Sequence, residues 1–175
     1  MKSFYLIPVL ACFCSCSVLV GQVKPLEEKF VNDPTPAHSL DSLGWRKIGS
    51  QDPSDRSSEL PDEAWQSSKT AAVISLNSVC RKGAGGERDV KKVTKVLLSQ
   101  WDNLKIEQQS PLAMRSLPAL QTTARGKYLG RDRKFQIVVV KSPTCIYDLI
   151  YLSPIESFEQ ELSAFVRFRD TLELK

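Results

Sequence analysis

The chain has 175 residues, of which 42% are hydrophobic and 25% are charged, and its formal net charge is +4. This composition predicts a globular protein with one core, and the absence of any run of five basic residues argues against nucleic acid binding. The single histidine, His38, argues against a zinc site of histidine and cysteine ligands, so no metal or cofactor is expected.

Residues 1–21 have the pattern of an export signal. Lys2 supplies a positive start, and an apolar run follows from Phe4 to Val20. Three of the five cysteines lie inside this run: Cys12, Cys14 and Cys16. We interpret residues 1–21 as a signal peptide or a lipoprotein signal. The protein is then a lipoprotein of the bacterial periplasm or outer membrane, or alternatively secreted.

Three processing outcomes remain open for this segment. The run Phe13-Cys14-Ser15-Cys16 resembles a bacterial lipobox and would place a lipid on Cys16, with Cys12 as the alternative attachment point. An ordinary signal peptidase would cut after Gly21. Without a cut, the segment is roughly long enough to anchor the chain in a ~30 Å hydrocarbon core, although Pro8 would disturb the helix.

The segment after the signal has the composition of a linker. Residues 22–42 are rich in proline and polar residues, which predicts a flexible tether. We expect one folded domain over residues 43–175. Trp45 and Trp65 should be buried and hold the early part of that domain, with one or two strands near Trp45.

The middle of the chain alternates between strand and helix patterns. Residues 71–80 read as a strand whose core-facing set includes Ile74 and Leu76. A glycine-rich loop follows at 82–86. Residues 87–101 read as a helix with one apolar face formed by Val90, Val93, Leu97 and Trp101. Strands are then expected at 104–108, at 119–128 with an interruption at Gly126, at 134–141 and at 144–152.

The final segment has a helix signal. Ser153, Pro154 and Glu156 form a capping-box pattern before the helix. An apolar stripe then runs along it through Phe158, Leu162, Phe165, Phe168 and Leu172. The short turns between strands favour antiparallel pairing. The fold class is therefore α+β, with a largely antiparallel sheet and two main helices packed on it as an α/β/α sandwich.

Cys80 and Cys145 are the two cysteines outside the signal segment. In an exported protein two such cysteines indicate a disulfide. The alternative is two separately buried thiols that act as small apolar side chains.

The element order carries a resemblance over residues 45–175. The strand ending at Cys80, the glycine-rich loop, Leu97-Leu98, the CIYDLIYL strand and the closing Phe-rich helix resemble the PsbP-like or Mog-type α/β/α sandwich. That group includes the extrinsic photosystem II protein PsbP and small exported bacterial lipoproteins of the DcrB type. The resemblance implies a binding or assembly factor and not an enzyme, and it transfers no functional residue.

The candidate chemistry of the domain is sparse. The loop Gly83-Ala84-Gly85-Gly86 lies between a strand and a helix, where phosphate-binding loops occur, but it lacks their motifs. It is interpreted either as an anion-binding site or as a plain connector. Asp148 is expected to form a salt bridge with Arg167 or Arg169. Tyr147 and Tyr151 share one face, either as core or as an aromatic binding strip.

These observations predict an exported, non-catalytic protein of the cell envelope. It would be attached to the membrane through a lipid or its N-terminal segment, and would work through a protein partner or in envelope assembly. The alternative is a carrier with a small-ligand pocket between sheet and helix.

Overall fold

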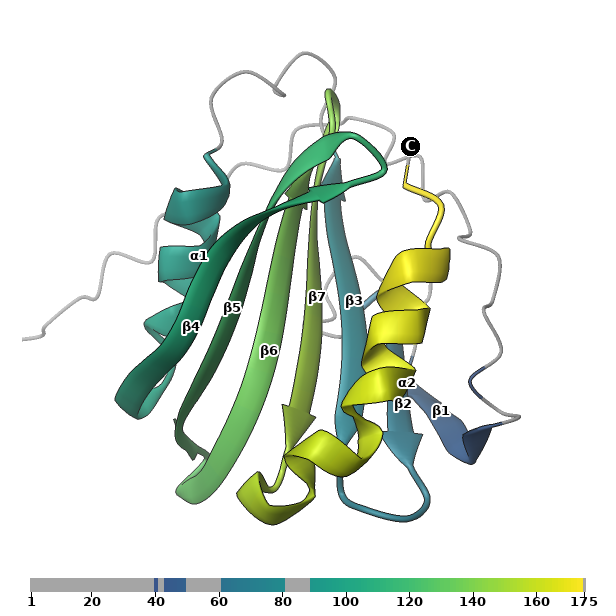
Figure 1. The fold of residues 1–175 in the computed structure, drawn as a ribbon, viewed down its shortest axis with the longest axis vertical. Coiled ribbons are helices and arrows are strands. Elements are labelled where there is room, and N and C mark those ends of the chain that lie inside the picture. The colour runs from purple at the N-terminus through teal and green to yellow at the C-terminus, as the bar shows by residue number, and fades with distance from the viewer. Residues whose placement is uncertain (1–39, 41–42, 50–60, 81–88, 175) are drawn as a thin grey trace, which may run out of the picture.

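The structure is a computed structural model that describes residues 40, 43–49, 61–80 and 89–174. The predicted signal, most of the tether and the glycine-rich loop lie outside these residues. Figure 1 shows one layered unit, and its elements are β1 (Trp45–Gly49), β2 (Glu63–Ser67), β3 (Val73–Cys80), α1 (Val90–Leu98), β4 (Asp102–Met114), β5 (Leu117–Tyr128), β6 (Arg131–Lys141), β7 (Cys145–Ser153), the short 3-10 helix η2 (Ile155–Ser157) and α2 (Phe158–Thr171).

The strands form a single seven-stranded sheet with the order β1-β2-β3-β7-β6-β5-β4. Every neighbouring pair is antiparallel. The helices lie on opposite faces of the sheet, with α2 in front of β3 and α1 behind β5 and β6 in Figure 1. The predicted α+β class, with an antiparallel sheet and two packed helices, is confirmed.

The larger half of the core lies between the sheet and α2. Phe158, Phe165 and Phe168 are at most 1% exposed and pack against Leu149 and Tyr151 of β7. The Tyr151 hydroxyl donates a hydrogen bond to the Phe158 carbonyl at 2.8 Å, which satisfies the one polar atom of that buried ring. The predicted apolar stripe of the last helix is therefore confirmed as its core-facing side.

The second half of the core lies between the sheet and α1. Val90, Val93, Leu97 and Trp101 pack there, as their helical spacing predicts. The Trp101 ring stacks on Phe135 of β6 with centroids 3.8 Å apart. Asp89 caps the helix by accepting a hydrogen bond from the Lys91 amide at 2.9 Å, so the helix begins three residues later than expected.

The early strands are held by their tryptophans and by one residue of α2. Trp45 and Trp65 are 3% and 2% exposed, which confirms their predicted burial. Glu161 of α2 is also buried, and its carboxylate accepts hydrogen bonds from Ser67, at 2.6 Å, and from Thr70. These bonds tie α2 to the turn between β2 and β3 and satisfy a carboxylate that would otherwise be costly to bury.

Three strands of the sheet, β4, β5 and β6, are longer than their sequence pattern predicts. β4 continues to Met114, past Pro111, which an edge strand tolerates because its outer N–H groups need no partner. β5 runs without interruption through Gly126. A Cβ at Gly126 would lie 2.9 Å from the Asp102 carbonyl oxygen, so glycine here permits close approach of β4 and does not end the strand.

The predicted capping box before the last helix does not form. The Ser153 hydroxyl pairs with the Ser157 hydroxyl at 3.1 Å, and the chain enters the 3-10 helix η2 before α2 begins at Phe158. Pro154 adopts an extended conformation with ψ of 146°, which places the helix start beyond the reach of Ser153.

Candidate functional site

The face of the sheet that carries α2 is only partly covered by it. In Figure 1, α2 lies over the β3 side, while β4, β5 and β6 continue beyond it; among the described residues, the short η2 contacts β6 and no second α-helix lies on this face. Along β6, alternate residues face α2. Val138 and Val140 join the core, but the same face continues to Gln136 and Lys134.

Cross-strand register brings further polar residues to this part of the sheet. Thr123 of β5 pairs with Gln136, and Arg125 pairs with Lys134. We call the resulting surface the polar face. It consists of Glu107, Gln121, Thr123, Arg125, Lys134 and Gln136 from the sheet, with Glu159 and Arg169 from α2.

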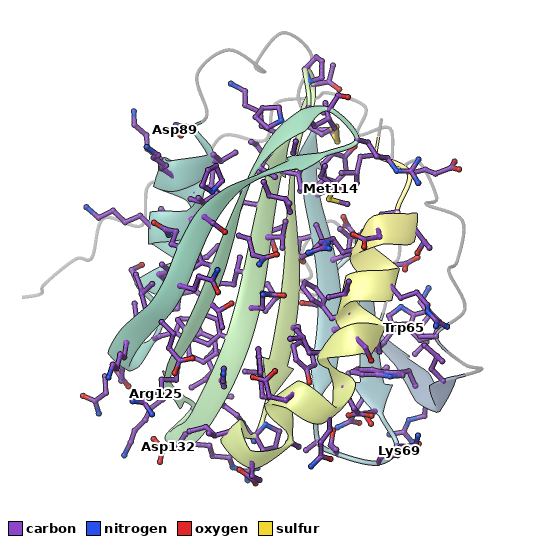
Figure 2. The ribbon with its side chains drawn as sticks, in the orientation of Figure 1. Trp65, Lys69, Asp89, Met114, Arg125 and Asp132 are labelled. Carbon is purple, nitrogen blue, oxygen red and sulfur yellow. A yellow bond between two sulfur atoms is a disulfide. The ribbon has the colours of Figure 1, made fainter. Side chains whose placement is uncertain are left out.

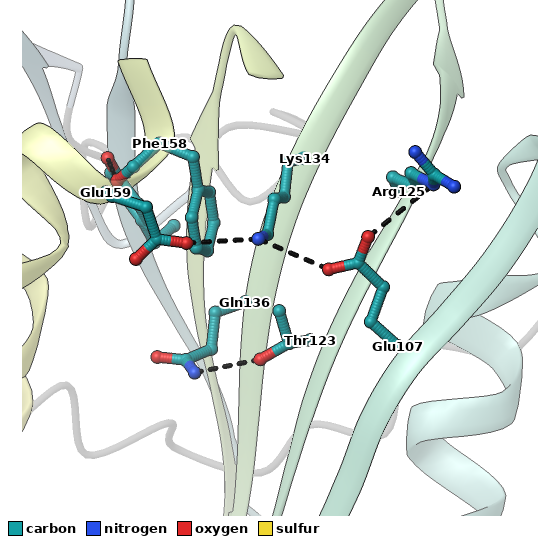
Figure 3. Close-up of polar contacts among 8 residues, drawn as sticks. Glu107, Thr123, Arg125, Lys134, Gln136, Phe158 and Glu159 are labelled. Atoms are coloured by element: carbon teal, nitrogen blue, oxygen red, sulfur yellow. Dashed lines mark hydrogen bonds and ion pairs between the residues drawn. The ribbon is translucent and has the colours of Figure 1, made fainter. Parts of the chain in front are cut away.

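A chain of four charges crosses the lower part of the polar face (Figure 3). The Arg125 Nε lies 3.5 Å from one Glu107 oxygen, and the Lys134 Nζ lies 3.2 Å from the other. The Lys134 Nζ also lies 3.1 Å from Glu159 and 4.5 Å from the centre of the Phe158 ring. The charges therefore neutralise one another and fix Lys134 between sheet and helix.

The environment of Lys134 favours its charged form. Partial burial by itself lowers the pKa of its ammonium group, but the hydrogen bonds and charges of Glu159 and Glu107 more than offset burial, so that pKa is raised. Lys134 therefore acts as a fixed cation at neutral pH and not as a proton acceptor.

Gln136 is the most unusual residue of the polar face. It is only 6% exposed, and its Nε2 donates to the Thr123 hydroxyl at 3.0 Å. Its Oε1 is buried and has no hydrogen-bond partner among the described residues. A buried acceptor without a partner is destabilising, so such groups in native proteins call for an explanation.

The upper part of the polar face is formed by Arg169. Its Nη1 donates to Gln121 Oε1 at 2.9 Å, and its Nε lies 2.7 Å from Asp170. Arg169 is therefore engaged across the gap between α2 and β5.

The predicted salt bridge of Asp148 with Arg167 or Arg169 is wrong. Asp148 lies on the α1 side of the sheet, whereas α2 lies on the other side. Its partner is Asn77, whose Nδ2 donates to Oδ1 at 2.6 Å. Burial raises the pKa of the Asp148 carboxyl, the Asn77 hydrogen bond opposes this, and the charge of Asp62 adds to it.

Tyr147 and Tyr151 are core residues, being 8% and 0% exposed, so the aromatic binding strip is ruled out. Burial raises the pKa of Tyr151 to about 12.

In the structure Cys80 and Cys145 are paired in register on β3 and β7 and form a disulfide with a Cα–Cα distance of 4.1 Å. A disulfide at this position joins two neighbouring strands of the sheet centre.

The remaining sequence candidates lie outside the described residues: Cys12, Cys14, Cys16, His38 and the loop 83–86. Within the residues that the structure describes, no group of three or more His, Cys, Asp or Glu is arranged to hold a metal ion. None of the helices in that part of the chain combines the length and apolar character needed to span a bilayer.

No family model and no curated protein matches this sequence. Among solved structures, the solution structure of cyanobacterial PsbP (CyanoP) from Synechocystis sp. PCC 6803 matches with a TM-score of 0.55 at 10% sequence identity, over 75% of this chain and 82% of that chain. The fold is PsbP-like. The resemblance inferred from element order is thus confirmed at the level of the fold.

Two further structures match with a TM-score of 0.49. LpqN of Mycobacterium tuberculosis, a protein involved in cell envelope biogenesis, is 13% identical, and the match covers 69% of this chain and 72% of that chain. Protein PA94 of Pseudomonas aeruginosa, of unknown function, is 15% identical, with 75% and 81% covered. At these identities the PsbP-like fold says nothing by itself about partners or substrates.

The polar face was missed in the sequence because its residues come from three strands and a helix. One signal was present: the alternating set Lys134, Gln136, Val138, Val140 changes from polar to apolar along one face of a strand. The polar end of this set lies beside the start of α2, where the Lys134 Nζ contacts Glu159 and the Phe158 ring.

Proposed function

We propose that this chain is an exported, lipid-anchored and non-catalytic protein of the cell envelope that binds a protein partner through the polar face. The leader pattern of residues 1–21 supports export, and Cys16 or Cys12 would carry the lipid. A disulfide between Cys80 and Cys145 suits an oxidising compartment outside the cytoplasm.

The observation that carries the binding proposal is the buried Oε1 of Gln136. Because this oxygen is buried, a partner would have to displace the side chains that cover it; donating an N–H or O–H group to it would then remove the energetic penalty of leaving it unpaired. Around it, Arg125 and Glu107 present both signs of charge at the surface, as the rim of a protein interface does. Because these charges are already paired with one another, the surface suits recognition better than proton transfer.

Charge reversal in the polar face tests this proposal. Arg125 is exposed at its rim, and Arg125→Glu would place a carboxylate beside Glu107 without touching the core. The matched control is Arg46→Glu, also exposed, on β1 at the opposite edge of the sheet. After crosslinking in isolated envelopes, we expect one partner protein to be captured by the wild type and Arg46→Glu and lost with Arg125→Glu. Capture of the same proteins by all three would overturn the proposal.

Lipid attachment is tested separately by labelling with a radioactive fatty acid. Incorporation should disappear in Cys16→Ala, or in Cys12→Ala if the earlier lipobox is used. Absence of label in the wild type, or equal label in both variants, would rule out lipid attachment at Cys16 or Cys12.

The alternative is a small-ligand carrier, and the same Gln136 oxygen is what favours it, because one buried acceptor matches a small donor as well as a protein surface. Native mass spectrometry of protein purified from envelopes distinguishes the two. A bound mass of a few hundred daltons that is lost in Gln136→Met supports the carrier, whereas a protein adduct lost in Arg125→Glu supports the partner.

A further inference from the structure

The turn between β5 and β6 combines two features that oppose folding stability. Leu129 and Gly130 both adopt positive φ, at 50° and 74°, as in the tight two-residue hairpin turn that prefers Asn, Asp or Gly. A large aliphatic side chain is uncommon in this left-handed region. Leu129 also gains nothing from packing, because it is 86% exposed.

The opposite end of β5 supplies an internal comparison. The β4–β5 turn at Arg115 and Ser116 has the same backbone form, with φ of 50° and 67°, and both residues are polar and exposed. The fold therefore accommodates a polar residue at the first position of such a turn. The geometry of the hairpin gives no reason for a leucine at position 129.

The side chains around the turn are mainly basic and amphipathic. Lys127, Arg131 and Arg133 have no carboxylate within salt-bridge distance among the described residues, and Asp132 is the one acidic residue between positions 127 and 133. Tyr128 is 38% exposed and rests against Trp101, with ring centroids 5.0 Å apart. Figure 2 shows Arg125 and Asp132 at the lower end of the sheet, where this turn lies.

We propose that the β5–β6 turn docks on an anionic lipid surface. Leu129 enters the region between headgroups and acyl chains, Tyr128 lies at the interface, and Lys127, Arg131 and Arg133 contact headgroup phosphates. The long basic side chains can keep their charges at the headgroups while their carbon chains cover the apolar boundary. Three acidic residues partly oppose this attraction: Asp132 and Asp102, which pair in register with Lys127, and the exposed Glu156 of η2, which follows the end of β7 beside Lys134.

A lipid surface fits this turn better than a protein groove does. A stable protein interface needs a packed core of many residues, and this convex tip offers one aliphatic side chain with cations spread around it. A bilayer interface accepts a single apolar residue and attracts scattered cations through its negative surface potential. This inference rests on the turn alone and holds whether or not the polar face binds a partner.

The test uses the full chain reconstituted in vesicles of phosphatidylcholine and phosphatidylglycerol at 3:1, with a benzophenone amino acid in place of Leu129. The matched control carries the same probe in place of Arg115, in the equivalent turn at the other end of β5. We expect a covalent lipid adduct from position 129 and several-fold less from position 115. Equal yields, no lipid adduct at 129, or an adduct only to protein would each overturn the proposal.

The charges are tested in the position 129 probe background. Arg131→Ser combined with Arg133→Ser should lower the lipid adduct several-fold, and so should vesicles of phosphatidylcholine alone. A yield that is unchanged in both would contradict an electrostatic role. Separately, Leu129→Asn should raise the Tm because it places a preferred residue in the left-handed region; a lower Tm would show that leucine serves stability instead.

Discussion

Gln136→Met tests whether the unpaired oxygen of the polar face is a cost carried by the folded protein. Methionine is similar in length and unbranched, so it can occupy the same buried position on β6 without its polar atoms. If the Gln136 oxygen is kept for a partner, removing it should make the isolated protein more stable and the complex weaker.

The magnitude follows from three contributions. Removing an unsatisfied buried acceptor recovers about 1–3 kcal/mol, and the lost hydrogen bond between Gln136 Nε2 and Thr123 removes about 1 kcal/mol. Methionine adds apolar burial worth about 1 kcal/mol. The free energy of unfolding should therefore rise by about 1–3 kcal/mol.

Urea unfolding measures this change. With a denaturant slope of about 2 kcal/mol per molar, the midpoint should rise by roughly 0.5–1.5 M. Thr123→Val is the control: it removes the partner of Nε2, leaves the whole amide unpaired and should destabilise the protein. A loss of stability above about 1 kcal/mol in Gln136→Met would refute the reasoning, because it would show that Oε1 is already satisfied.

Three further predictions concern the core, the disulfide and pH. Phe165→Ala should lower stability by about 3–5 kcal/mol, since the side chain is 0% exposed; a loss below about 1 kcal/mol would contradict its core position. Replacing Cys80 and Cys145 by alanine should remove about 4 kcal/mol, as expected for a bridge between residues 65 apart; unchanged chemical unfolding would contradict this. The raised pKa of Asp148 means that its carboxyl binds a proton more tightly in the folded state than in the unfolded state. The stability that this protonation adds is therefore present at low pH and is lost as pH rises through the folded-state pKa. Asp148→Asn should therefore be more stable than the wild type at pH 7 but not at pH 3, and equal stability at both values would contradict the burial of a charged Asp148.

Much of the fold could be predicted because its patterns are local. The stripe from Phe158 to Leu172 places the same five residues on one side of a helix whatever its neighbours, and the run KFQIVVVK forms a strand by composition. The boundaries of the strands were predicted less well than their existence. Pro111 and Gly126 are usually read as breaks, and only the edge position of β4 and its close approach to β5 make them tolerable within strands.

The polar face could not be predicted because it depends on pairing between strands. The contact of Lys134 with Glu107 and Glu159 joins β6 to β4 and α2, and nothing in the local sequence specifies that register. The error at Asp148 has the same origin. Strand alternation correctly placed Asp148 on the other face of β7 from Tyr147. The sequence pattern did not specify which of the two faces α2 covers.

Site-specific photocrosslinking shows whether the polar face binds a protein partner in the envelope. A photoreactive amino acid is placed at position 125 in the polar face and, as the control, at position 46 on the far edge of the sheet. In intact envelopes, we expect a discrete protein adduct from position 125 that disappears in Gln136→Met, and none from position 46. Adducts from both positions, or from neither, would contradict this expectation.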